Sequence, residues 1–96
     1  MSEILRDRIE EQAEIHQILS NPYRLLILCS LVQTELSVSE IAEEIGTSLQ
    51  NTSQHLRLMK DRGVLESRRD GQTIFYQIAS NEVGNNCKQM VACLEK

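Results

Sequence analysis

Residues 37–62 read SVSEIAEEIGTSLQNTSQHLRLMKDR, and this stretch decides the fold. Hydroxyl side chains that can cap a helix open the stretch and Gly46 closes its first part, which predicts a helix of about two turns. A second helix is predicted from about Leu49 to Arg62, with Gly63 ending it. The residues expected to face inward are, in the first helix, Val38, Ile41, Ala42 and Ile45 and, in the second, Leu49, Thr52, Ser53, Leu56 and Met59.

This order of a short helix, a three-residue turn with glycine and a second helix is the helix-turn-helix pattern. In that pattern the second helix enters the major groove of DNA. Gln and Asn pair with adenine, Arg pairs with guanine and Ser suits phosphate. The candidate DNA contacts on the outward positions of the second helix are Ser48, Gln50, Asn51, Gln54, His55 and Arg57.

A β-hairpin is predicted to follow over about 64–78. Two β-prone runs flank Asp70-Gly71, a dipeptide typical of a tight hairpin turn. Arg68, Arg69 and Gln72 lie at or beside the expected tip, where they would reach a minor groove or flanking phosphates.

Three further helices are predicted around this centre. Asn21 and Pro22 can open a helix that is apolar nearly all round over 25–32, a pattern typical of a buried central helix. The first helix is expected at about 3–19. The last, at about 81–94, carries one stripe of Val83, Cys87, Met90, Val91 and Leu94.

Composition fits one domain over residues 1–96, with a net charge of −4 that is unevenly spread. Residues 1–16 sum to −3, whereas residues 48–77 sum to +2, so the predicted DNA-binding region is the only positive block. No run is long enough to span a membrane, and the N-terminus does not resemble a signal peptide. A cytoplasmic location with reduced cysteines is therefore expected.

Ordered motifs across residues 15–83 resemble the ArsR family of winged-helix repressors. They read LSNPYRLLIL at 19–28, ELSVSEI at 35–41, SQHL at 53–56, GVL at 63–65 and QTIFY at 72–76. The resemblance implies a mainly α fold with a hairpin wing, in the order α-α-α-α-β-β-α. It also implies a homodimer paired through the first and last helices, which binds an inverted-repeat operator and is released by an inducer.

Neither usual metal site of that family is present. In the frame of the arsenic-type site, Ser37 and Ser39 stand where the family carries cysteines, and hydroxyls hold soft metals poorly. The zinc-type frame reads Ser80, Glu82, Cys93 and Lys96, which do not complete a tetrahedral shell. No metal and no cofactor is predicted.

The resemblance extends to the branch that senses oxidants or reactive sulfur through two thiols. Cys29 stands at the first thiol of that branch, and Cys93 lies about two residues short of the second. Cys87 shares the apolar stripe of the last helix, which favours packing. Cys29 and Cys93 are the candidate sensor thiols, with Cys87 less favoured.

Other functions are open at this point. One is a repressor that holds a metal through a non-standard set including Cys87 and Cys93; another is a regulator that needs no ligand. A protein-interaction module without DNA binding is a third. A thiol enzyme is not predicted, because the chain has no Cys-x-x-Cys motif and no candidate base placed by a motif.

Overall fold

The computed structural model describes residues 1–95, with side chains for residues 1–94. The predicted element order is confirmed within that range, with a short additional strand before the third helix. The elements are α1 (Glu3–Ile18), α2 (Pro22–Leu31), β1 (Leu36–Ser37), α3 (Val38–Ile45), α4 (Leu49–Asp61), β2 (Leu65–Asp70), β3 (Thr73–Ile78), α5 (Glu82–Ala92) and a closing 3-10 turn, η1 (Cys93–Glu95).

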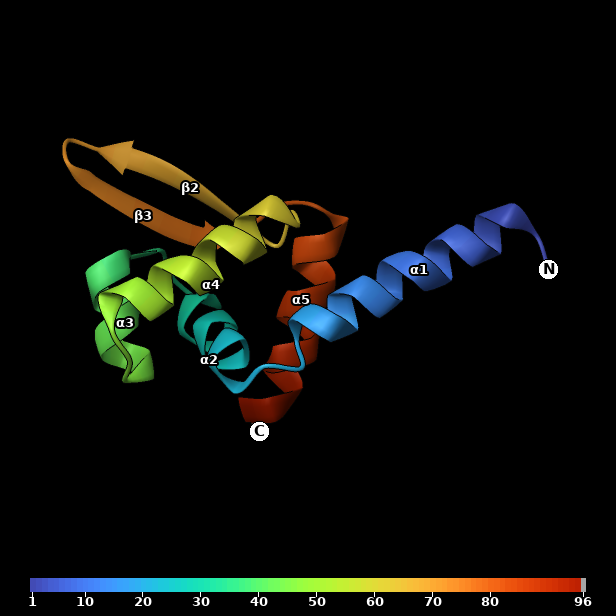
Figure 1. Ribbon diagram of the computed structural model, residues 1–96, viewed down its shortest axis with the longest axis horizontal. Helices are drawn as coiled ribbons and strands as arrows, with labels where there is room; N and C mark the ends of the chain where they lie inside the picture. The colour runs from blue at the N-terminus through green and yellow to red at the C-terminus, as the bar shows by residue number, and fades with distance from the viewer. Residues whose placement is uncertain (96) are drawn as a thin grey trace.

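The molecule is elongated, with extents of 48 × 30 × 22 Å, because two elements project from a compact body (Figure 1). The body contains α2, α3, α4 and α5. The β2–β3 hairpin extends from one end, and α1 extends from the other with the N-terminus at its tip (Figure 1). No helix among the described residues combines the length and the hydropathy needed to cross a membrane.

Each α-helix begins at a polar residue whose side-chain oxygen accepts a hydrogen bond from a backbone N–H of the first turn. This cap replaces a partner that the first turn lacks inside the helix. Before α3 the cap is reciprocal, since Glu40 also accepts from the backbone N–H of Ser37 at 2.9 Å. The five capping residues are Ser2, Asn21, Ser37, Ser48 and Asn81.

The sheet has three antiparallel strands in the order β1-β3-β2. β1 was not predicted, because two residues are too few to show the alternation of a strand. The hairpin turn was placed one residue too early: Asp70 pairs with Thr73, so the turn is Gly71-Gln72. Gly71 has φ 64°, a left-handed conformation that glycine adopts without steric penalty.

The core lies where α2, α3, α4 and α5 meet the base of the hairpin. Several predicted inward positions are exposed instead. Leu26 is exposed on α2, next to the fully buried Ile27 and Leu28. Leu49 and Ser53 are exposed on α4, whose inward face is narrower than predicted. The last helix ends at Ala92 rather than 94, and Met90 and Leu94 remain exposed.

Candidate nucleic-acid interface

The second helix of the helix-turn-helix, α4, is anchored by one face and presents another to solvent. Thr52, Leu56 and Met59 are fully buried. The solvent face carries a polar stripe at positions i, i+3, i+4 and i+7, which share one side of a helix. We call this the α4 stripe; its residues are Gln50, Ser53, Gln54 and Arg57.

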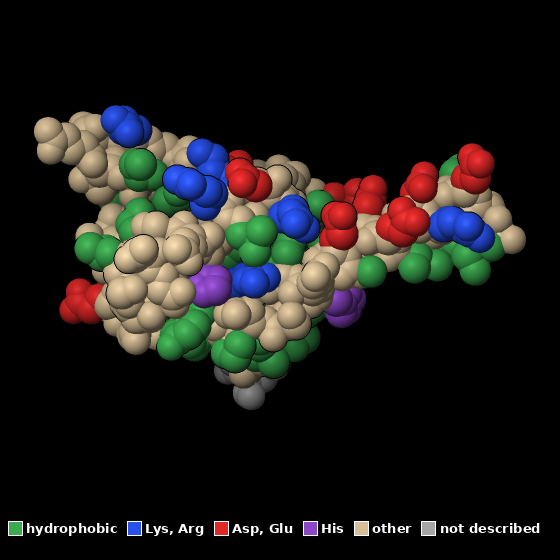
Figure 2. Space-filling view, viewed as in Figure 1, with side chains coloured by type: hydrophobic (Ala, Val, Ile, Leu, Met, Phe, Trp, Pro, Cys, Tyr) green, Lys and Arg blue, Asp and Glu red, His purple; other side chains and the backbone are tan. Residues whose placement is uncertain are grey.

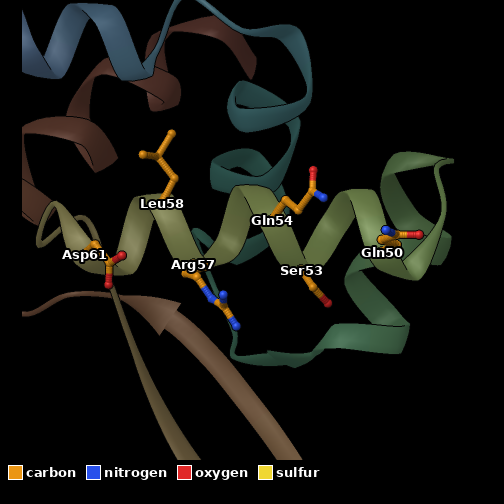
Figure 3. Close-up of a pocket in the computed structure, with 6 residues that line it drawn as sticks. All are labelled: Gln50, Ser53, Gln54, Arg57, Leu58 and Asp61. Carbon is orange, nitrogen blue, oxygen red and sulfur yellow. The ribbon is translucent and has the colours of Figure 1, made fainter.

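The α4 stripe borders an open hollow of about 380 Å³ together with Leu58 and Asp61 (Figure 3). Ser53 and Arg57 extend toward the side of α4 on which the hairpin strands pass (Figure 3). The sequence pattern predicted Ser53 on the inward face of α4, but Ser53 is exposed and lies on the α4 stripe. Its spacing from Gln50, Gln54 and Arg57 is the signal that could have predicted this position. The amide and guanidinium groups of this stripe are those that recognise base edges in a major groove.

Two of the residues predicted to contact DNA, Ser48 and Asn51, also form hydrogen bonds at the start of α4. The Ser48 hydroxyl accepts from the backbone N–H of Asn51 at 3.0 Å. The Asn51 side-chain amide donates to the Thr47 hydroxyl at 3.1 Å, and Asn51 is half-buried. These bonds stabilise the turn between α3 and α4.

His55 was predicted as a DNA contact, but it lies against α2 rather than on the α4 stripe. Its Nδ1 accepts from Nε of Arg24 at 3.4 Å, and its ring lies 6.0 Å from that of Tyr23. Burial, and secondarily the Arg24 charge, lowers the pKa of His55. Arg24 also donates to the carbonyl of Ile18 at 3.2 Å, so this cluster connects the end of α1 with α4.

The three predicted hairpin contacts do not lie together. Paired residues share a face of the sheet, and faces alternate along each strand. Arg69, opposite Ile74, therefore lies on the face whose base is buried in the core, and Gln72 lies in the turn. Arg68 lies on the opposite face, where Glu35 binds it. The structure therefore places Arg68 and Arg69 on opposite faces of the hairpin.

Charge is separated along the molecule (Figure 2). Lys and Arg side chains gather over the hairpin and α4, whereas Asp and Glu side chains gather along α1. This placement agrees with the positive sum over 48–77 and the negative sum over 1–16. A polyanion would therefore be attracted to the α4 end of the molecule and repelled by α1.

The three cysteines have different environments. Cys87 is fully buried, and burial raises the pKa of its thiol, which keeps it protonated and unreactive. Cys29 is half-buried and packs against the core from α2. Cys93 is exposed after the end of α5, and its thiol donates to the Gln89 carbonyl at 3.6 Å.

No group of three or more His, Cys, Asp or Glu side chains suited to holding a metal occurs in the part of the chain that the structure describes. In the zinc-type frame, Ser80, Glu82 and Cys93 are all exposed, and Lys96 lies outside the described residues.

The chain matches a family model described as a helix-turn-helix domain over residues 19–68. It is 37% identical over 76 residues to a biofilm growth-associated repressor of Xylella fastidiosa, covering 79% of this chain and 67% of that protein. Reduced HlyU from Vibrio cholerae has a TM-score of 0.83 at 31% identity, covering 97% of this chain and 94% of that one. A homodimeric winged helix-turn-helix DNA-binding domain from Mycobacterium bovis is described as a possible ArsR-family transcriptional regulator. It has a TM-score of 0.81 at 29% identity, covering 99% of this chain and 84% of that one.

Proposed function

The chain belongs to the ArsR family of winged-helix transcriptional regulators, and from this premise we propose that it is a homodimeric repressor released by thiol oxidation. The observation that carries the DNA-binding part is the α4 stripe, a set of base-reading side chains on the exposed face of the second helix of a helix-turn-helix. The α4 stripe reads base edges in the major groove. Arg69 and Gln72 contact flanking phosphates or the minor groove from the hairpin.

The homodimer is supported by apolar surface that one copy leaves uncovered. The end of α1 is buried in the core through Ile15 and Ile18. Further out, α1 carries the exposed apolar residues Ile4, Leu5 and Ile9, which are not part of their own subunit's core, and Figure 2 shows hydrophobic side chains along one edge of the projecting helix. A second copy related by a two-fold axis would cover this surface and set two α4 helices on successive turns of an inverted repeat.

Replacing Gln54 with Ala is expected to relax base preference in one half-site position, because a bidentate amide contact is worth about 1–3 kcal/mol of discrimination. Replacing Arg69 with Met is expected to weaken binding to all duplexes and to lower the slope of log affinity against log salt by about one. Fluorescence anisotropy on a duplex selected from a random pool, and on its single-base variants, measures both effects. Identical behaviour of the two variants would contradict this assignment of base and phosphate contacts.

For the sensing step we propose a disulfide between Cys29 and Cys93. The two thiols lose two protons and two electrons to an oxidant, which is reduced as the S–S bond forms. Three observations support the pair: α2 and α5 pack together, Cys93 is exposed, and buried Cys87 is protected. The bridge requires Cα atoms within about 7 Å, so the segment after α5 must approach α2. Because α5 borders the proposed dimer surface, this movement changes the spacing of the two α4 helices and lowers operator affinity.

Diamide treatment is expected to lower operator affinity of the wild-type protein by about tenfold or more, which needs only about 1.4 kcal/mol of coupling. Cys29→Ser and Cys93→Ser variants should keep their affinity under the same treatment, whereas Cys87→Ser should respond as wild type. Mass spectrometry of tryptic peptides identifies the bridge, and reductant should restore binding. A bridge to Cys87, or release by a metal but not by an oxidant, would refute this sensing step.

A further inference from the structure

The side chain of Arg68 is held on the outer face of the sheet by two partners. Its Nε donates to both carboxylate oxygens of Glu35, at 3.0 and 2.9 Å, and its Nη2 also donates to Glu35. The guanidinium carbon lies 4.6 Å from the centre of the Phe75 ring. A multidentate pair with a carboxylate, combined with stacking on an aromatic ring, fixes the planar guanidinium in one position.

The contact between Glu35 and Arg68 joins two separate parts of the fold. Glu35 immediately precedes β1 and the helix-turn-helix, whereas Arg68 and Phe75 lie on the hairpin. β1 has only two residues with which to pair β3. The Glu35–Arg68 pair therefore adds a side-chain connection between the hairpin and the segment that leads into α3.

The surroundings of Arg68 are unfavourable for a phosphate. Glu66, Arg68 and Asp70 share the outer face, because they alternate with the core-facing residues of β2. With Glu35, this face carries three carboxylates against one guanidinium. Arg69, on the other face, is not bound by a carboxylate in any contact that the structure gives. A DNA backbone is therefore attracted to Arg69 and repelled from the face of Arg68.

We propose that Arg68 is a positioning residue, which with Glu35 fixes the angle of the hairpin to the helix-turn-helix, and that it is not a phosphate ligand. This inference rests on the proposed DNA-binding function. It assigns Glu35 a role in operator binding although Glu35 itself never contacts DNA. Both side chains are substantially exposed, at 53% for Arg68 and 32% for Glu35, so the pair adds little to global stability and acts on orientation.

Glu35→Gln decides whether Arg68 positions the hairpin or binds phosphate, because the two roles predict opposite changes in operator affinity. If the pair positions the hairpin, Glu35→Gln and Arg68→Met each lower operator affinity by roughly three- to tenfold and the double variant is no worse than either, since all three remove one interaction. If Arg68 binds phosphate, Glu35→Gln frees a cation and raises affinity, and only Arg68→Met lowers affinity.

Arg68→Lys and the salt dependence give two independent measurements. Lysine keeps the charge but cannot form the planar multidentate pair, so positioning predicts a loss close to that of Arg68→Met, whereas a phosphate contact predicts nearly wild-type affinity. The salt slope should be unchanged in Arg68→Met and lower by about one in Arg69→Met. A reduced slope in Arg68→Met, or full activity of Arg68→Lys, overturns the proposal.

Hydrogen exchange of the hairpin amides without DNA separates this inference from the proposed function. Exchange from β2 and β3 should accelerate in Glu35→Gln and Arg68→Met, while the thermal midpoint of unfolding stays within about 2 °C of wild type. If the wild type binds no duplex, the proposed function fails, yet faster exchange would still establish the positioning contact. Unchanged exchange in both variants overturns it.

Discussion

Replacing Ile9 with Glu is expected to convert the protein to a monomer and to lower operator affinity by at least about 100-fold. Two half-sites bound by one dimer gain affinity through effective concentration, which commonly exceeds single-site binding by about 10²–10⁴. Ile9 is 49% exposed on the projecting part of α1, and Leu5, one turn earlier on the same side, is 47% exposed. A buried glutamate at a two-fold contact would face apolar surface without a partner charge.

The expected partner surface lies on the same molecule. Met90 is exposed near the end of α5, Leu94 is exposed in η1, and Leu26 is exposed on α2. An isologous contact would bring α1 of one copy against α5 of the other, with each apolar set used twice. Burial of this surface in a dimer would also explain why Leu26 is exposed in a single copy, although α2 is apolar nearly all round.

Glu10→Gln is the control, because exposed Glu10 lies among the acidic residues of α1, about 100° around the helix from Ile9. It should remain dimeric and bind the operator at least as well as wild type. Light scattering at micromolar concentration measures the mass, and anisotropy measures affinity on the same samples. A wild-type mass of 11.0 kDa, or an Ile9→Glu variant that stays dimeric, would show that α1 is not the contact.

Local sequence signals predicted the elements because caps and periodicity act within a few residues. The hydroxyl caps and Gly46 predicted α3 as a helix of about two turns, and the structure has it at Val38–Ile45 with Ser37 as the cap. The hairpin turn was shifted by one residue because Asp70-Gly71 is typical of one turn type, while the observed turn uses Gly71-Gln72. Strand β1 depends on pairing with β3, a contact between distant segments that no local pattern encodes.

The contacts of the candidate site residues were predicted less completely, because these contacts involve tertiary partners that are distant in the sequence. Helical spacing identified Gln50, Gln54 and Arg57 on one side of α4. It could not show that His55 is hydrogen-bonded by Arg24, since 31 positions separate them. Nor could it show that Arg68 is held by Glu35, 33 positions away. Adjacent arginines on a strand point to opposite faces, and this alternation alone would have separated Arg68 from Arg69.

Gly84→Ala is expected to destabilise the protein severely, although the same change in most helices stabilises by about 0.5–1 kcal/mol. A Cβ at position 84 would lie 1.9 Å from the carbonyl oxygen of Ala79 and 2.8 Å from its carbonyl carbon. The obstacle is backbone and cannot rotate away. Its neighbourhood is also fixed, because the Ala79 N–H donates to the Val64 carbonyl at 2.9 Å and the Asn81 amide donates to the Gly63 carbonyl at 3.1 Å.

Relief of this clash requires α5 to move away from the core, and that movement would separate buried Cys87 and Val91 from their packing partners. Overpacking of this kind costs about 3 kcal/mol or more when backbone must shift, which corresponds to a loss of roughly 12–24 °C in Tm for a domain of this size. Asn85→Ala, at the exposed neighbouring position, is the control and should be neutral or slightly stabilising. Calorimetry measures both variants. Because α5 also carries Met90 and precedes Cys93, Gly84→Ala should weaken both the proposed dimer and the proposed oxidant response. An unchanged Tm would mean that α5 is not docked against Ala79.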